Sequence, residues 1–241
     1  MRRETQNVLL VLLGGALLKI GLTGDYLRYV KPTHQPWLVG TAAVTVALGV
    51  VAIVRDVLVA RRAVVDHAGH EHHARSAWLL VLPVLAVFLV APPALGADSV
   101  RRDAAAGAVQ GAQRPESPFP PLPDDDVVPL SMTAFVTRAG WDPADSLVGR
   151  TVSLTGFVVH ADGEVMLARL VIGCCAADAS PVRVRLVGEA VEELAEIPED
   201  TWLTVTGTLV PGTAIPETGY RPDLTVLTVR EVAEPADPYE H

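Results

Sequence analysis

Three long apolar runs in the first hundred residues constrain this chain more than any other feature of its sequence. They cover residues 8–22, 38–54 and 77–95. The second run has seventeen residues without a charge, just enough for a helix to cross the hydrocarbon core of a bilayer. We therefore predict a transmembrane domain of residues 1–97 with three helices, at about 7–25, 37–55 and 77–96. A cleaved signal peptide is the alternative for the first run, but no small-residue cleavage site follows it.

The basic residues beside these runs predict how the chain crosses the membrane. Six lie at the amino terminus or between the second and third runs, and four lie in the other two flanking segments. The first group is Arg2, Arg3, Arg55, Arg61, Arg62 and Arg75, and the second is Arg28, Lys31, Arg101 and Arg102. The positive-inside rule then places the amino terminus in the cytoplasm. Three spans put everything after residue 97 outside the cytoplasm.

The composition changes after the third run. Residues 98–129 are rich in Ala, Gly, Pro and Asp, which predicts a linker that is semi-rigid in its proline part. Residues 130–234 then form an extracytoplasmic domain, and residues 235–241 a tail. The net charge of −9 comes from this half, because residues 147–234 contain six arginines, no lysine and thirteen acidic residues. Such an acidic domain excludes binding to nucleic acid.

From residue 150 onward, apolar residues alternate with polar ones, which is the period of a β-strand. This alternation recurs in four segments, 152–158, 182–186, 203–209 and 224–229. Residues 189–197 instead have helical spacing and end before Pro198. Counting two strands around the cysteine pair, one more before the helix and two after it, the order predicts an all-β, OB-like barrel of five strands in a Greek key, with one helix between strands three and four.

Cys174 and Cys175 are the only two cysteines, and they lie in the middle of this region. Adjacent side chains on a regular strand point to opposite faces, so the two thiols act together only if the backbone bends, as Gly173 permits. Three interpretations remain open. The pair is a vicinal disulfide, a soft-metal site completed by Asp178 or an imidazole such as His160, or two buried small hydrophobic side chains.

Asp178 decides between metal binding and thiol catalysis. It adds an oxygen ligand three residues after the pair, and its charge disfavours a reactive thiolate. We therefore favour contact with a metal, zinc or another thiophilic divalent ion, or with the substrate. We assign no catalytic residue, so an enzyme is not predicted. The predicted cytoplasmic loop has a second candidate metal site in four histidines, for which a solvated polar loop is the alternative. These are His67, His70, His72 and His73.

Several motifs are similar to those of a known family. Residues 174–179 (a CC-x-A-D-A motif), 169–172, 156–158, 202–207 and 29–32 resemble the YcgQ-like family of two-component membrane permease complex subunits. The resemblance implies a multi-pass protein of the bacterial cell membrane, an accessory subunit paired with a larger integral-membrane permease in the lipid bilayer. The alternatives are an extracytoplasmic thiol–disulfide protein and a structural adaptor with buried cysteines.

Overall fold

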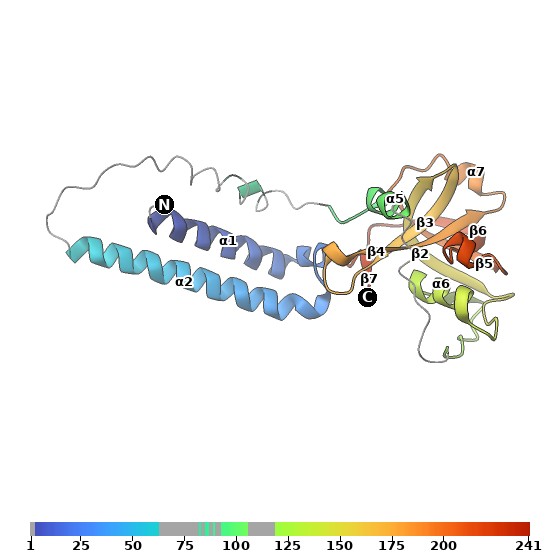
Figure 1. Cartoon of the computed structure of the whole chain (residues 1–241), viewed down its shortest axis with the longest axis horizontal. Coiled ribbons are helices and arrows are strands. Elements are labelled where there is room, and N and C mark those ends of the chain that lie inside the picture. Colours follow the sequence, from blue (N-terminus) through green and yellow to red (C-terminus); the bar gives the residue numbers. More distant parts are fainter. Residues whose placement is uncertain (1–2, 63–81, 83–84, 87–88, 90–92, 106–118) are drawn as a thin grey trace. The chain divides into compact units, whose positions relative to one another are not determined.

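The computed structural model of this chain (Figure 1) forms two compact units, Met1–Pro93 and Ala94–His241. The structure describes residues 3–62, 82, 85–86, 89, 93–105 and 119–241. The four histidines of the predicted cytoplasmic loop and most of the third predicted span lie outside these residues.

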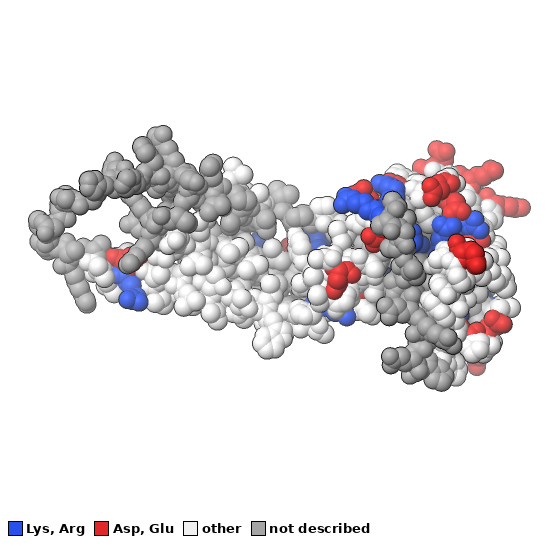
Figure 2. All heavy atoms as spheres, in the orientation of Figure 1, with Lys and Arg blue, Asp and Glu red and all other residues white. Residues whose placement is uncertain are grey.

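The first unit is a pair of helices. Its elements are α1 (Arg3–Thr23), η1 (Asp25–Arg28), η2 (Pro32–His34) and α2 (Gln35–Arg62). Within the described residues, two segments are long and apolar enough to cross a membrane, Gln6–Thr23 and Pro32–Val59. Figure 2 shows mostly uncharged side chains over the described part of this unit. Length and composition therefore permit two membrane-spanning helices where the sequence predicts the first two spans.

Small residues let α1 and α2 pack closely. A Cβ atom added to Gly14 would lie 2.8 Å from Cγ2 of Val46, so this glycine permits the approach of the two helices. Near one end of the pair, the Asn7 amide donates a hydrogen bond of 2.8 Å to Asp56 Oδ2. The large apolar side chains that remain exposed on α2 include Trp37, Val44, Leu48 and Val51.

The second unit is built on a mixed β-sheet. Its strands are β1 (Val127–Pro129), β2 (Thr151–Ala161), β3 (Glu164–Val171), β4 (Ser180–Val187), β5 (Trp202–Val210), β6 (Asp223–Glu231) and β7 (Tyr239–Glu240). β2 pairs with β5, β5 with β6, β6 with β4, β4 with β3, and β3 again with β2, so the pairing forms a ring of five strands. β1 and β7 join β2 and β3 in parallel. The sequence-based prediction of a C-terminal β domain is confirmed at this level.

The alternation of apolar residues accounts for the main core. Val152, Leu154, Val182 and Val184 are fully buried in one cluster, because every second residue of β2 and β4 faces inward. Helix α6 (Met132–Trp141) adds further apolar side chains to this cluster. The helix begins where the Ser131 side chain accepts a hydrogen bond from the amide of Ala134. The short helix α7 (Val191–Leu194) lies between β4 and β5.

A second apolar cluster covers the other face of the sheet. Helix α5 (Ala97–Ala105) contributes Ala97 and Val100, each 1% exposed. At its beginning, the amide of Ala97 donates a hydrogen bond of 2.6 Å to Asp200 Oδ1. The structure therefore places a packed helix at the start of the segment that the sequence predicts to be a linker. The apolar residues spaced three apart on α5 explain this, since they bury one side of a short helix.

The far end of the predicted linker also belongs to this unit. The Arg138 guanidinium donates to the carbonyl oxygen of Pro120 at 2.6 Å, and β1 extends the sheet beside β2. The predicted tail is likewise part of the fold, because β7 pairs with β3. The Glu240 carboxylate accepts hydrogen bonds of 2.8 Å from the amides of Met132 and Thr133 at the start of α6.

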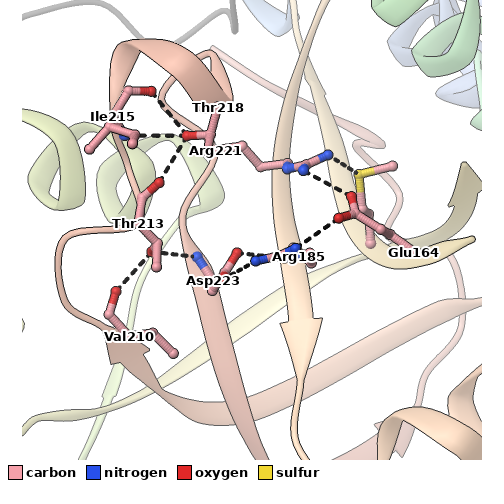
Figure 3. A network of polar contacts seen from close by, with 9 residues as sticks. Glu164, Arg185, Val210, Thr213, Ile215, Thr218, Arg221 and Asp223 are labelled. Atoms are coloured by element: carbon pink, nitrogen blue, oxygen red, sulfur yellow. Dashed lines mark hydrogen bonds and ion pairs between the residues drawn. The ribbon is translucent and has the colours of Figure 1, made fainter. Parts of the chain in front are cut away.

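A network of charged side chains fastens the loop between β5 and β6 to the first residue of β3. Figure 3 shows Arg185 between the carboxylates of Glu164 and Asp223. Arg185 donates to each carboxylate at 2.8 Å. Arg221, from the loop, forms a second ion pair of 2.8 Å with Glu164. This end of β3 is thereby joined to β4, to β6 and to the preceding loop.

Candidate functional site

The candidate site is the loop of residues 173–179 between β3 and β4, which we name the cysteine loop. It contains the short 3-10 helix η3 (Ala176–Asp178). Cys174 is exposed, Cys175 is partly exposed, and both are free thiols. The interpretation of two buried hydrophobic cysteines is therefore wrong. The loop leaves the sheet where β3 ends, so the two side chains avoid the strand alternation that would have buried one of them.

Asp178 holds the loop in a bend. Its carboxylate accepts hydrogen bonds from the amides of Gly173, at 3.0 Å, and Cys174, at 2.7 Å. The amide of Asp178 in turn donates to the carbonyl oxygen of Cys175 at 3.0 Å. A Cβ atom on Gly173 would lie 3.0 Å from Oδ2 of Asp178, so glycine gives the carboxylate room to approach. This is the bend that the two adjacent cysteines require.

The bend brings the two sulfur atoms to the same side of the loop. Their Sγ atoms lie 3.6 Å apart. A disulfide bond requires about 2.05 Å between the sulfurs, so the pair is close without being bonded. Both thiols can therefore contact a single small ligand from one direction.

Hydrogen bonds within the loop keep the Cys174 thiol protonated. The hydrogen bond to Asp178, followed by the one to Cys175, raises the pKa of Cys174 to about 11. The hydrogen bond from the Cys174 thiol lowers the pKa of Asp178 in return. At neutral pH the loop thus carries an ionised carboxylate beside a neutral Cys174. The sequence predicts this effect from charge repulsion, whereas in the structure a direct hydrogen bond is its main cause.

Of the other predicted ligands, Asp178 lies beside Cys174, but His160 is not assembled with the cysteines. His160 lies on β2, where its Nε2 donates a hydrogen bond of 2.9 Å to the carbonyl oxygen of Ile197. Across the described part of the chain, no group of three or more His, Cys, Asp or Glu side chains is close enough to hold a metal ion. Neither His160 nor Asp178 therefore completes a closed site around Cys174 and Cys175. His67, His70, His72 and His73 fall outside the described residues.

Residues from distant parts of the sequence support the loop. The amide of Ile172, just before the loop, donates to the carbonyl oxygen of Glu240 at 3.0 Å. Arg169 donates to the carbonyl oxygens of Asp237 and Pro238 at 3.0 and 3.2 Å, and its guanidinium lies 4.9 Å from the ring centre of Trp202. Burial is the main cause of the lowered pKa of Arg169. The sequence contains no signal for these contacts, because they join residues 33 to 69 positions apart.

Comparisons with known proteins give a domain assignment. A family model described as the DUF1980 N-terminal domain matches residues 5–104, and one described as the DUF1980 C-terminal domain matches residues 141–241. No curated protein matches the sequence.

Among solved structures, the chain is similar to asparaginyl-tRNA synthetase from Pyrococcus horikoshii, crystallised in complex with asparaginyl-adenylate. The identity is 14%, over 38% of this chain and 22% of that one, with a TM-score of 0.24. The chain thus spans less than a quarter of the synthetase's length, and a likeness this low carries no argument about fold or function.

Proposed function

From the premise that this chain contains both domains of the DUF1980 family, we propose that it is a membrane-anchored accessory subunit of a permease complex. Its cargo is a thiophilic divalent metal ion such as zinc, and the cysteine loop is the contact for that ion. The larger permease subunit is the partner that the resemblance to the YcgQ-like family implies. The amino terminus is cytoplasmic and the second unit extracytoplasmic, as the distribution of basic residues predicts.

The pairing of the strands supports an OB-type barrel as the scaffold of this site. The ring β2-β3-β4-β6-β5 has the strand order of that fold, with a parallel β4–β6 pair and a helix between the third and fourth strands. OB folds carry many unrelated functions, so the fold does not identify the ligand. The cysteine loop alone points to the chemistry of the cargo.

The distance between the two sulfur atoms carries the proposal. Two thiolates that bind one tetrahedral zinc ion, each at about 2.3 Å, are about 3.8 Å apart. The Sγ atoms of Cys174 and Cys175 lie 3.6 Å apart and are accessible. The loop therefore needs almost no rearrangement to bind such an ion through both sulfurs.

The small number of protein ligands favours an ion that is bound transiently and transported over an ion that is bound permanently. A structural zinc site uses four protein ligands, whereas this loop offers two thiols and at most the Asp178 carboxylate beside them. The remaining coordination positions are free for water or for groups of another molecule, so the ion can be handed on. Both thiols must lose their protons when the ion binds. Because the pKa of Cys174 is raised to about 11, binding strengthens as the pH rises toward that value.

A thiol–disulfide exchange function has weaker support. The attacking group in that reaction is the thiolate, and its fraction falls as the pKa rises. With its pKa raised to about 11, Cys174 is almost fully protonated at neutral pH. A metal ion can displace that proton directly, whereas a disulfide substrate cannot. The function of a purely structural adaptor leaves the exposure of the two thiols unexplained.

Cadmium binding tests the metal contact. Cadmium is added to the full-length protein in detergent, and the ultraviolet absorption of cadmium–thiolate bonds is recorded for the wild type and for Cys174→Ser/Cys175→Ser. We expect saturation at one ion per chain in the wild type and no thiolate signal in the double variant.

Replacement of His67, His70, His72 and His73 by alanine is the matched control and should leave that signal unchanged. A wild-type protein without the signal would refute the metal contact. Uptake of cadmium by cells that produce the double variant then tests the transport role. Normal uptake with normal membrane insertion would refute that role.

A further inference from the structure

The residues that connect the second unit to the preceding chain are fixed on its surface. The amide of Leu95 donates a hydrogen bond of 3.1 Å to the hydroxyl oxygen of Tyr239. Two residues later, the Ala97 amide is bound by Asp200, and Ala97 and Val100 are buried. From Leu95 onward the chain is therefore bound to the domain, and no unattached linker separates Leu95 from it.

That place lies beside the cysteine loop. Tyr239 is the β-sheet partner of Leu170, near the last residue of β3, and the amide of Ile172 bonds to the next residue of β7. The cysteine loop begins one residue later, at Gly173. Its Ala176 and Ala179 pack on the same apolar cluster as Ala94. The cysteine loop and Leu95, where the chain joins the domain, therefore lie at the same end of β3.

The opposite end of β3 carries the charged network of Figure 3. There Glu164, the first residue of the strand, binds Arg185 and Arg221 and holds the loop between β5 and β6. A strand of eight residues has its ends separated by about 23 Å. Glu217, in the short helix η4 (Pro216–Thr218) of that loop, is exposed. It provides a reference position at the end of the domain away from the cysteine loop.

From this arrangement we propose that the cysteine loop faces the phospholipid headgroup layer, next to the point where the chain leaves the membrane. The third predicted span covers residues 77–96, but the chain belongs to the second unit from Ala94 on. A span that ends there instead puts the bilayer boundary just before Leu95. The loop suits this position because its side chains are small and its one charged group, Asp178, already accepts two amide hydrogen bonds. The proposal rests on the membrane anchoring in the proposed function and is independent of metal binding.

Its consequence is that an ion bound to the loop is at the membrane surface. The Arg185 network then points toward the surrounding solution. A cargo delivered to an embedded permease would pass through the cysteine loop last, with no need for the domain to turn over.

Fluorescence quenching by lipids that carry a nitroxide on the headgroup tests the proposal. The full-length protein with Cys174→Ser and Cys175→Ser is combined with Ala177→Cys in the cysteine loop or with Glu217→Cys at the other end. Each single cysteine is labelled with the same small fluorophore, and the protein is reconstituted into phosphatidylcholine vesicles. We expect quenching several-fold stronger at position 177 than at position 217. The variant Cys175→Ser, labelled at the native Cys174, repeats the measurement without changing Ala177.

Equal quenching at the two ends, or stronger quenching at position 217, would overturn the proposal. Absence of quenching at both positions would overturn it too, because the domain would then stand away from the bilayer. None of the labelled variants has a free thiol of the metal contact, because Cys174 and Cys175 are each replaced by serine or blocked by the label. A failure of cadmium binding therefore leaves this measurement unaffected, and a failure of quenching leaves the cadmium result in place.

Discussion

Replacing Asp178 with asparagine should make the Cys174 thiol more reactive. In the structure the Asp178 carboxylate is the largest cause that raises the pKa of Cys174 to about 11, above its ordinary value of 9.0. Asparagine keeps the shape of the side chain and a carbonyl acceptor for the loop amides, but it removes the negative charge. The pKa of Cys174 should therefore move back toward its ordinary value.

The size of the effect follows from two opposing terms. At pH 8, lowering a thiol pKa from about 11 to 9.0 increases the thiolate fraction about a hundredfold. A less basic thiolate is also a weaker nucleophile, which reduces its reactivity about eightfold at a Brønsted coefficient of about 0.45. The net rate at pH 8 should rise up to about tenfold. The gain in thiolate fraction outweighs the loss of nucleophilicity because the Brønsted coefficient is below one.

The assay is the reaction of the full-length protein with an aromatic disulfide, followed by absorbance from pH 7 to pH 11. It is run in a Cys175→Ser background, so that Cys174 is the only thiol in the chain. Asp162→Asn, in the turn between β2 and β3, is the matched control and should not change the rate. If Asp178→Asn raised the rate by the same factor at every pH, the loop would have opened and the pKa argument would be refuted. An unchanged rate at pH 8 would refute it as well.

Two further changes test how the second unit is held together. Glu240→Ala removes two amide contacts and one hydroxyl contact at the start of α6, and we expect a loss of about 1–2 kcal/mol in unfolding free energy, measured by urea denaturation. An unchanged urea midpoint would mean that the predicted tail does not stabilise this helix. Gly156→Ala places a Cβ atom 2.5 Å from the carbonyl oxygen of Ala168, and we expect a lower melting temperature and a loss of about 2–3 kcal/mol. A melting temperature equal to that of the wild type would show that β2 and β3 can separate there without cost.

Local patterns were enough to predict several parts of this protein. The apolar runs at residues 8–22 and 38–54 coincide with α1 and α2, because spanning length depends on composition alone. The alternation in 152–158 and 182–186 identified β2 and β4, since a strand with one buried face repeats every two residues. The need for a bend at the two cysteines also followed from their adjacency. The assignments that depend on the third apolar run and on the histidine tract remain predictions.

The tertiary structure decided which of these features act together. Asp200 binds the start of α5, and Arg169 binds the segment just before β7, in each case through a contact between residues far apart in the chain. Such pairings leave no periodic pattern in the sequence, because each requires only one suitable residue at each end. The exposure of Cys174 and Cys175 and the place of their loop beside Leu95 were decided in the same way. Local sequence specifies the conformation of a segment, whereas its neighbours are fixed only when the whole sheet closes around a common core.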